Sequence, residues 1–497
     1  MHLSVIYSRA LAGVDAPLVQ VETHLSNGLP AFHIVGLPET AVRESRDRVR
    51  CALLNSHFDF PDRRITVNLA PADLPKEGGR FDLPIALGIL GASGQVPVDR
   101  LAEHEFLGEL ALDGTLRSVP GAVAAADAAQ CAGRSLVVAP QCAPLAALAP
   151  ASRIVAASDL LTVCAHLNGA APIPPSVPLQ TATMPHYPDM RDVVGQHSAR
   201  RVLEIAAAGG HHLLLEGPPG SGKTLMASRL PGILPPPEPA EALMALALRD
   251  IHDGWMQTDA LFQRPFRAPH HSASAAALAG GGSKPRPGEI SLAHGGVLFL
   301  DEFPEFSRHC LEMLREPLES GEITLSRARH KVTYPARFQL VAAMNPCPCG
   351  YLGDGQRSCR CAPEQVQRYQ ARISGPLLDR IDLHAQVGRV APANLLGRER
   401  GGEASDVIRS RVCRARERQT VRQGCANSQL PPDAIASTCL LEGPQIKAVE
   451  SAAIRLHLSA RSVHRLLRVA LTISDLEGAG RVEIDHIREA LGYRGPH

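Results

Sequence analysis

A chain of 497 residues exceeds what one hydrophobic core usually supports, so we expect two to four domains. Apolar residues make up 45% of the chain, which is ordinary for a globular protein. Its 51 Lys and Arg residues balance 50 Asp and Glu residues, giving a formal net charge of +1. This balance argues against a protein that binds polyanions over its whole surface, but it leaves open nucleic acid bound by a few basic loops.

The compartment follows from what the sequence lacks. The N-terminus has neither the basic region nor the long apolar run of a secretory signal. No stretch approaches the roughly 18 consecutive apolar residues of a membrane span. The 12 cysteines are scattered, except for four between Cys347 and Cys361, as expected of reduced thiols. We therefore expect a cytoplasmic protein with no membrane partner.

The first segment, residues 1–167, has the mixed pattern of an α/β domain. Runs of β-branched residues bounded by turn formers predict strands, and an amphipathic pattern predicts a helix. The expected strands are 18–25, 31–36, 64–70 and 135–140, and the expected helix is 39–56. Proline is so dense in residues 168–190 that we interpret this segment as a linker.

A second α/β domain is expected over residues 191–395, followed by a helical domain over residues 396–497. Continuous apolar runs in the second domain are typical of strands in a parallel sheet covered on both faces. These runs are 212–217, 296–302 and 338–345, and the helical patterns of the last domain are 462–478 and 484–492. The expected fold class is therefore α/β and multidomain.

Residues 217–224 read GPPGSGKT, between the strand pattern HLLLE and the helix pattern LMASRLPGIL. This strand–loop–helix context is the one in which a P-loop binds phosphates. Glycines let backbone N–H groups face the phosphates, and the helix N-terminus adds positive dipole character. Lys223 is expected to reach the β- and γ-phosphates of ATP, and Thr224 to bind Mg²⁺. The other loop residues are Gly217, Pro218, Pro219, Gly220, Ser221 and Gly222.

Two further strand patterns end in polar residues. Asp301 follows the run GGVLFL, where it can hold the Mg²⁺ shell, and the adjacent Glu302 can polarise the attacking water. Asn345 ends the run FQLVAAM, where it can reach the γ-phosphate and the water. A solvated strand end is the ordinary interpretation of such residues, but the upstream P-loop favours the catalytic one.

These three elements together resemble those of AAA+ ATPases, in which Asn345 matches the sensor-1 position. Three longer segments resemble the magnesium-chelatase-like branch and, within it, the ComM/YifB family, over essentially the whole chain. They are PFRAPHHSASAAALAGGGSKPRPGEISLAHGGVLFLDE (265–302), MNPCPCGYLGD (344–354) and SGPLLDRIDL (374–383). The PFRAPHH and NPCPCG portions are far more specific than the P-loop.

The resemblance implies a function that spacing alone does not reach. Members of this family are hexameric AAA+ helicases that promote branch migration of DNA when incoming strands recombine during natural transformation. By the same resemblance, Arg380 in LLDRID matches the arginine finger, which reaches the γ-phosphate of the neighbouring subunit. Arg461 in LSARSVHRLL matches the sensor-2 arginine of a helical lid, although Arg465 and Arg468 lie on the same expected helix.

The first domain resembles the ribosomal-protein-S5-like fold of the Lon protease domain. LPKEGGRFDLPIAL (74–87) aligns with the Lon segment that carries the nucleophilic serine, and Arg80 takes that position. FLGELALDGTLRSVPGAV (106–123) aligns with the stretch of the catalytic lysine, where Val123 stands. Without nucleophile or base, serine–lysine proteolysis is not expected. We interpret the domain as a binding or ring-organising module, whose Lys76, Arg80 and Arg117 could touch DNA phosphates or be solvated.

Cys347, Cys349, Cys359 and Cys361 form the pattern C-x-C-x₉-C-x-C. Four thiolates so close in sequence could surround one tetrahedral Zn²⁺, and the turn-rich segment between the pairs would let the loop close. C-x-C is tighter than the usual C-x₂-C knuckle, so a reduced cysteine-rich loop or disulfides formed after purification are alternatives. We favour a structural zinc that rigidifies the loop beyond Asn345.

Two segments are candidates for contact with DNA. The first is the glycine-rich loop from Phe266 to Gly288, and the second is a β-hairpin expected over residues 322–340. In the AAA+ branch that the chain resembles, such insertions face a central pore, where basic groups would grip a sugar–phosphate backbone without reading its sequence. The basic residues are Arg267, His270, His271, Lys284 and Arg286 in the loop, and Arg327, Arg329, His330 and Lys331 at the hairpin tip.

Three functions compete at this point. The favoured one is a homohexameric DNA motor that hydrolyses ATP to move branch points. The alternative is a chelatase-type AAA+ ATPase that remodels a protein partner for insertion of Mg²⁺ into a porphyrin, although a Lon-like first domain is not expected there. The third is an ATP-dependent protease, which Arg80 and Val123 argue against. Stimulation of ATP hydrolysis by DNA, a partner subunit or unfolded protein would separate them.

Overall fold

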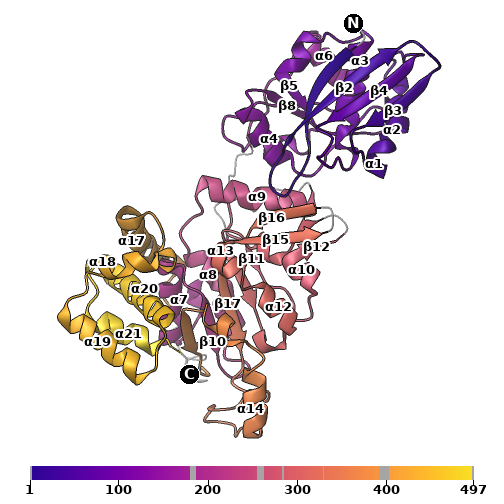
Figure 1. Ribbon diagram of the computed structural model, residues 1–497. Coiled ribbons are helices and arrows are strands. Elements are labelled where there is room, and N and C mark those ends of the chain that lie inside the picture. Colours follow the sequence, from indigo (N-terminus) through magenta and orange to yellow (C-terminus); the bar gives the residue numbers. More distant parts are fainter. Residues whose placement is uncertain are drawn as a thin grey trace. The chain divides into compact units, whose positions relative to one another are not determined.

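The computed structural model describes residues 3–178, 186–254, 262–282, 285–327, 330–390 and 402–494 (Figure 1). They form two compact units. The first contains residues 1–184, 239–261 and 285–287, and the second contains residues 185–238, 262–284 and 288–497. The expected boundary at residues 395 and 396 lies outside the described residues. No helix in the described part of the chain is long and apolar enough to span a membrane.

The first unit is built on a seven-stranded sheet of order β3-β4-β2-β1-β5-β8-β9. Strand β2 pairs antiparallel with β1 and β4, whereas the other neighbours run parallel. The strands are β1 Leu3–Arg9, β2 Leu18–Ser26, β3 Ala31–Val35, β4 Arg64–Ala70, β5 His104–Phe106, β8 Ser135–Val138 and β9 Ile154–Ala156. A separate pair joins β6 Glu109–Leu110 to β7 Leu116–Arg117.

Side chains of β2 alternate between buried and more exposed, because successive residues of a strand point to opposite faces of the sheet. Helix α3 (Asp82–Ala92) is buried along its whole length and packs on β1 and β2, so it covers the apolar face. The helix expected over 39–56 is present as α1 (Thr40–Arg43) and α2 (Ser45–Asn55), separated by Glu44. Three more helices complete this part of the chain, α4 Ala122–Cys131, α5 Ala143–Ala146 and α6 Leu160–Leu167.

Helix α9 (Pro239–Asp253) belongs to the first unit, although it lies within the interval expected for the ATPase core. Its residues Leu246 and Ala247 form an apolar cluster with Val123 of α4 and Leu145 of α5. The chain reaches α9 from the second unit through the segment LPPPEP. The strand β13 (Arg286–Pro287) also belongs to the first unit.

The second unit is built on a five-stranded sheet of order β11-β14-β17-β10-β18, in which every pairing is parallel. Its strands are β11 Phe266–Arg267, β14 Val297–Leu300, β17 Gln339–Met344, β10 Leu213–Glu216 and β18 Leu383–Gln386. All residues of β14 and β17 are buried, which explains the uninterrupted apolar runs in the sequence. The expected hairpin is present as β15 (Glu322–Arg327) paired antiparallel with β16 (His330–Pro335).

Helices surround this sheet, and the C-terminal helices share its core. The buried residues of α7, β10 and α8 form one apolar cluster with those of α17, α20 and α21. The longer helices are α7 His197–Gly209, α8 Lys223–Ile233, α14 Pro363–Gln370, α17 Ser405–Gln423, α19 Gly443–Arg455, α20 Ala460–Glu477 and α21 Ile484–Gly492. The shorter ones are α10 Ala275–Ala279, α11 Glu289–Leu292, α12 Arg308–Met313, α13 Pro317–Ser320, α15 Gly375–Leu378 and α18 Ile435–Cys439.

Candidate nucleotide-binding site

The P-loop connects the end of β10 at Glu216 with the start of α8 at Lys223. It therefore lies at the carboxyl edge of the parallel sheet, where ligands of open α/β sheets bind. Its first residue must be glycine, because a Cβ on Gly217 would lie 2.2 Å from the carbonyl oxygen of Val387. Gly220 and Gly222 have φ angles of 77° and 88°, which turn the loop toward the helix N-terminus.

Lys223 is buried at the first position of α8 and faces the loop it follows. Its ammonium group donates to the carbonyl oxygens of Gly217 at 2.6 Å and Pro218 at 3.0 Å, and to Oδ1 of Asn345 at 3.2 Å. Burial lowers the pKa of Lys223. An anion placed at this helix N-terminus would compensate the buried positive charge.

Thr224 and Asp301 meet at the same edge of the sheet. The Thr224 hydroxyl donates to Oδ2 of Asp301 at 2.7 Å, so a hydroxyl and a carboxylate lie side by side. Such oxygens are the ligands that Mg²⁺ prefers. Strand β17 lies between β14 and β10, and it therefore brings Asn345 between the acidic strand and the P-loop. The structure thus brings together the four residues Lys223, Thr224, Asp301 and Asn345.

Glu302 follows Asp301 in an unusual backbone conformation. Its φ of 52° lies in the left-handed region, which few non-glycine residues adopt. The Glu302 N–H donates to Oδ1 of Asp301 at 2.9 Å, which fixes the turn. Its carboxylate lies 2.9 Å from Nδ1 of His271, in the loop after β11. The sequence indicated His271 only as part of a basic loop, and the PFRAPHH motif was the signal that could have singled it out.

The residues present fit a nucleoside triphosphate with Mg²⁺. Ser221 has a buried hydroxyl oxygen that finds no hydrogen-bond partner among the described residues. A buried polar atom without a partner is uncommon in folded proteins, and a phosphate oxygen at the P-loop would satisfy it. The buried ammonium of Lys223 is a hydrogen-bond donor suited to phosphate, and the neighbouring oxygens of Thr224 and Asp301 are ligands suited to magnesium.

Arg380 and Arg461 converge on one acidic residue of α13. Arg380, between α15 and β18, donates to the carbonyl oxygen of Pro376 at 2.7 Å and binds the carboxylate of Glu319. Arg461, in α20, binds the other oxygen of that carboxylate at 3.3 Å. The hydrogen bond from Arg380 holds the pKa of Glu319 below its ordinary value. Among the described residues, no hydrogen bond or ion pair joins either arginine to the P-loop of its own chain.

The other two arginines considered for the sensor-2 position are engaged inside the chain. Arg465 is buried, donating to the carbonyl oxygen of Ile381 and pairing with Asp379 at 3.3 Å. Arg468 donates to the carbonyl oxygen of Leu430 at 2.9 Å. Arg461 exposes 55% of its side chain, whereas Arg465 is buried and Arg468 is partly buried, so Arg461 is the most exposed of the three.

The four cysteines of the loop 347–361 converge, and their sulfur atoms all lie within 4.8 Å of one another. The loop also contacts the nucleotide site. Gly350 lies so close to the P-loop that a Cβ there would be 2.6 Å from Cδ of Pro219. The hydroxyl of Tyr369, at the end of α14, is hydrogen-bonded to the backbone of Asn345.

In the first unit, the positions aligned with the Lon nucleophile and base are buried. Arg80 is 6% exposed, and its guanidinium donates to the carbonyl oxygen of Pro120 at 2.9 Å. The N–H of Val123 donates to Oδ2 of Asp250 in α9 at 3.3 Å. Burial raises the pKa of Asp250 to about 6 and lowers that of Arg80 to about 10. The attraction between the two charges opposes both shifts but is smaller than the effect of burial.

This burial corrects one expectation for the first unit. Lys76 is fully buried and donates to the carbonyl oxygen of Pro71, so neither it nor Arg80 can be a solvated charge or a contact to DNA. Both residues are buried because apolar segments pack around them. The sequence of a loop with one basic residue does not predict this burial. Arg117 alone is exposed, lying 3.6 Å from Glu109.

The glycine-rich loop and the hairpin differ in whether their basic side chains are paired with other residues. Arg267 makes a bidentate pair with Glu289, both bonds being 2.6 Å, and the rings of His270 and His271 lie 4.1 Å apart. Lys284 and Arg329 lie outside the described residues, as do the side chains of Arg327 and His330. Lys331, on β16 of the hairpin, is exposed.

Comparison with known proteins places this geometry in a family. The family described as "Magnesium chelatase, subunit ChlI" matches residues 189–395, which hold the P-loop and the strands that end beside Asp301 and Asn345. "Subunit ChlI of Mg-chelatase" matches residues 21–142, and "Magnesium chelatase, subunit ChlI C-terminal" matches residues 402–494. The chain belongs to the magnesium-chelatase-like family of AAA+ ATPases.

Two full-length relatives narrow this to the ComM/YifB family. The chain is 49% identical over 500 residues to "Competence protein ComM" of Haemophilus influenzae, covering 99% of this chain and 98% of that protein. It is 49% identical over 494 residues to the YifB protein of Salmonella typhimurium, covering 99% and 97%. By contrast, "Magnesium-chelatase subunit ChlI" of Chlorella vulgaris matches at 29% over 109 residues, which cover 22% of this chain and 25% of that protein. The family assigned from the sequence motifs is confirmed.

Proposed function

We propose that this member of the ComM/YifB family is a cytoplasmic ATP-driven DNA motor. It assembles as a homohexamer, hydrolyses ATP, and promotes branch migration when incoming DNA recombines during natural transformation. Three features support the proposal: the assembled phosphate site, the basic hairpin, and full-length similarity to a protein named for competence.

Residues of the P-loop and residues at the ends of β14 and β17 have different roles in the proposed hydrolysis. Lys223 would turn its ammonium group from the loop carbonyls to the phosphates, and Thr224 and Asp301 would hold the Mg²⁺, whose charge would neutralise that of the phosphates. Glu302 accepts a proton from the attacking water, while Asn345 orients that water. Arg380 reaches the nucleotide of the neighbouring subunit, where its guanidinium stabilises charge that develops on the γ-phosphoryl oxygens. Hydrolysis therefore requires an assembled ring.

The observation that carries the motor proposal is the connection between the arginines and the hairpin. Glu319 binds both Arg380 and Arg461, and α13, which bears it, ends at Ser320. The first hairpin strand, β15, begins at Glu322. When Arg380 leaves Glu319 for a phosphate, α13 loses one of its two arginine contacts directly beside the hairpin, and the contact with Arg461 remains. The state of the nucleotide thus changes the position of a basic tip.

Contacts of this tip with DNA would be sequence-independent. Lys331 is exposed on β16, and three further basic residues stand at the tip in the sequence, Arg327, Arg329 and His330. Lys and Arg side chains bind phosphates and release counterions, so binding weakens steeply as salt rises. A motor that moves branch points needs this kind of grip, because it must pass over any sequence.

The test is steady-state ATP hydrolysis with no DNA, single-stranded DNA, duplex and a four-way junction. The Glu302→Gln protein serves as the blank, since it retains nucleotide ligands but lacks the base. Stimulation should be strongest with the junction. If no DNA changes the rate of an assembled protein, the DNA-motor proposal fails.

A chelatase-type ATPase acting on a protein partner is the second candidate. Its support is the match of residues 21–142, which lie in the first unit, to a family named for the chelatase subunit. In that case a partner protein, not DNA, should stimulate hydrolysis. A protease is disfavoured, because Arg80 and Val123 are buried and supply neither nucleophile nor base.

A further inference from the structure

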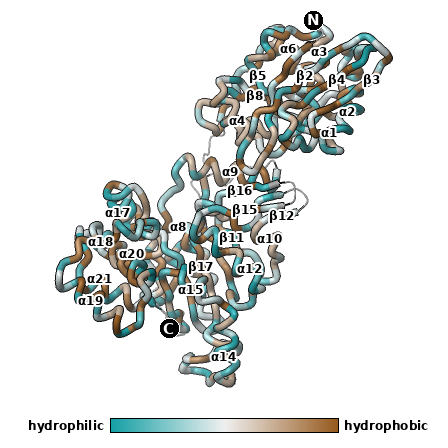
Figure 2. The backbone as a smooth tube through the Cα atoms, viewed as in Figure 1, coloured by the Kyte–Doolittle hydropathy of each residue, from teal (hydrophilic) through white to brown (hydrophobic). Residues whose placement is uncertain are grey.

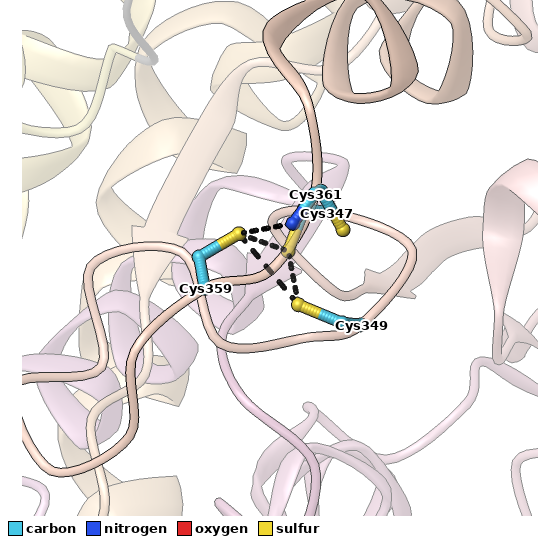
Figure 3. A group of neighbouring side chains, drawn as sticks. All are labelled: Cys347, Cys349, Cys359 and Cys361. Atoms are coloured by element: carbon cyan, nitrogen blue, oxygen red, sulfur yellow. Dashed lines mark hydrogen bonds between the residues drawn. The ribbon is translucent and has the colours of Figure 1, made fainter.

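Four cysteines that lie beside the nucleotide site make a cage of sulfur atoms (Figure 3). The sulfur of Cys347 lies 3.4 Å from that of Cys349 and 3.6 Å from that of Cys359. The sulfurs of Cys349 and Cys359 are 3.6 Å apart. With Cys361 included, all four lie within 4.8 Å of one another. We propose that they bind one Zn²⁺ ion, which holds the loop 347–361 against the P-loop.

The distances match a single tetrahedral ion. Zinc–sulfur bonds are about 2.3 Å long, and two ligands of a tetrahedron are then separated by about 3.8 Å. The sulfur separations of 3.4 and 3.6 Å lie close to that edge length. The cage is therefore the size that one ion requires, before any adjustment of the side chains.

Other arrangements of four cysteines fit less well. A disulfide brings two sulfurs to about 2.0 Å, and all four cysteines here are free thiols. An iron–sulfur cluster places several iron and sulfide atoms between its thiolates, so it holds them farther apart than the shared shell of one ion does. A tetrahedral set of four sulfurs around a single ion is typical of structural zinc.

The surroundings of the cage also suit a bound thiolate. Backbone N–H groups of Tyr351 and Arg360 are hydrogen-bonded to the Cys349 sulfur, and the N–H of Cys361 donates to that of Cys359 at 3.4 Å. Such outer donors orient the ligands of a metal and stabilise negative charge on sulfur. The cage therefore has a second layer of contacts, supplied by the loop itself.

Apart from an ion pair of 2.8 Å between Asp354 and Arg389 and a hydrogen bond from Arg357 to the Tyr351 hydroxyl, the loop has little regular structure to hold its shape. Residues between Cys349 and Cys361 form neither helix nor strand, and most are exposed, including Leu352 at 44%. Figure 2 colours the neighbouring helix α14 mostly hydrophilic, so no apolar core supports the segment from that side. Small segments of this kind gain their stability from a metal or disulfide.

The ion would stabilise contacts that reach the nucleotide site, an inference that rests on the proposed function. Cys347 and Cys349 lie just after Asn345, and Gly350 packs against Pro219 of the P-loop. The amide of Gln370 in α14 donates to the carbonyl oxygen of Pro346 at 3.3 Å. Fixing the loop at both C-x-C pairs therefore fixes the strand end that carries Asn345.

The test is the metal content of the full chain, purified with a reductant and dialysed against metal-free buffer. We expect about one zinc per chain by mass spectrometry, and release of that zinc as a mercurial reagent reacts with the cysteine thiols. The Cys359→Ser, Cys361→Ser double variant should contain about tenfold less zinc. Cys131→Ser, which alters an exposed thiol outside the cage, should keep it.

A second measurement guards against loss of folding in the double variant. Zinc-stripped wild-type protein is titrated with Co²⁺, whose thiolate charge-transfer absorption should saturate at one equivalent. Zinc below about 0.1 per chain in protein grown with added zinc, equal zinc in both variants, or bound iron with visible absorption would each overturn the assignment. Zinc content is independent of ATP hydrolysis, so failure of the motor proposal would leave this result intact. Unchanged ATP affinity after zinc removal would refute only the connection to the P-loop.

Discussion

Replacing Gly350 by alanine tests whether the cysteine loop supports the P-loop. Gly350 has a φ of 82°, and a Cβ there would lie 2.6 Å from Cδ and 2.8 Å from Cγ of Pro219. Gly353 offers a matched control, since its φ is 78° and a Cβ would meet nothing within 4 Å. Both variants strain the backbone equally, but only Gly350→Ala pushes on the nucleotide site.

The size of the effect follows from this difference. An alanine with positive φ costs about 1–2 kcal/mol in either variant. Carbon atoms pack at about 3.5 Å, so Gly350→Ala must also move the loop or the stiff proline ring by about 1 Å. Overpacking of this kind costs about 1–3 kcal/mol. If that energy is taken from the bound state of the P-loop, nucleotide affinity falls by about 5- to 140-fold relative to Gly353→Ala.

The assay is titration of both variants with a fluorescent ATP analogue, together with thermal unfolding and zinc content. Weaker binding by Gly350→Ala, with zinc retained in both proteins, is the expected result. Equal nucleotide affinities would refute the reasoning, because the loop would then yield without moving Pro219. A loss of stability shared by both variants measures backbone strain alone.

Four other substitutions test individual contacts. Glu302→Gln should bind ATP tightly and hydrolyse it at least about 100-fold more slowly, as measured by binding and turnover on one preparation. Arg380→Ala should bind ATP yet lose about 1,000-fold in turnover, and mixing it with Glu302→Gln chains should restore activity, because some interfaces then combine an intact base with an intact finger. Full activity of Arg380→Ala alone would exclude the finger. His271→Ala should lower kcat and leave the KM for ATP unchanged, since His271 contacts the base and not the phosphates; a change in KM alone would contradict this. Asp250 has a folded pKa of about 6, raised by burial from 3.8, so its contribution to stability is complete below pH 3.8 and is lost as pH rises through 6. The unfolding free energy of wild type relative to Asp250→Asn should therefore fall by about 3 kcal/mol over that range, and a constant difference would refute the shift.

The local chemistry of the site could be predicted from the sequence. A P-loop is a contiguous segment whose glycines, lysine and threonine act within one turn. Its sequence pattern therefore predicts the local geometry of the loop. The positions of Asp301 and Asn345 at strand ends were predicted because buried parallel strands appear as apolar runs that end in polar residues, while their catalytic roles stay predictions. The hairpin was also predicted, since its two strands adjoin in the chain. The assignments of Arg380 and Arg461 came from family resemblance, and their role in a neighbouring subunit stays a prediction.

Tertiary structure decided what depends on residues distant in sequence. The order of the sheet places β17 between β14 and β10, and only that order brings Asn345 to Lys223. No local pattern predicts that Glu319 binds two arginines, that His271 meets Glu302, or that α9 packs with the first unit. Burial of Lys76 and Arg80 was missed for the same reason, because a side chain's exposure depends on what packs over it. Spacing suggested a metal at the cysteines, but the closing of the loop is what brings the four sulfurs within 4.8 Å of one another.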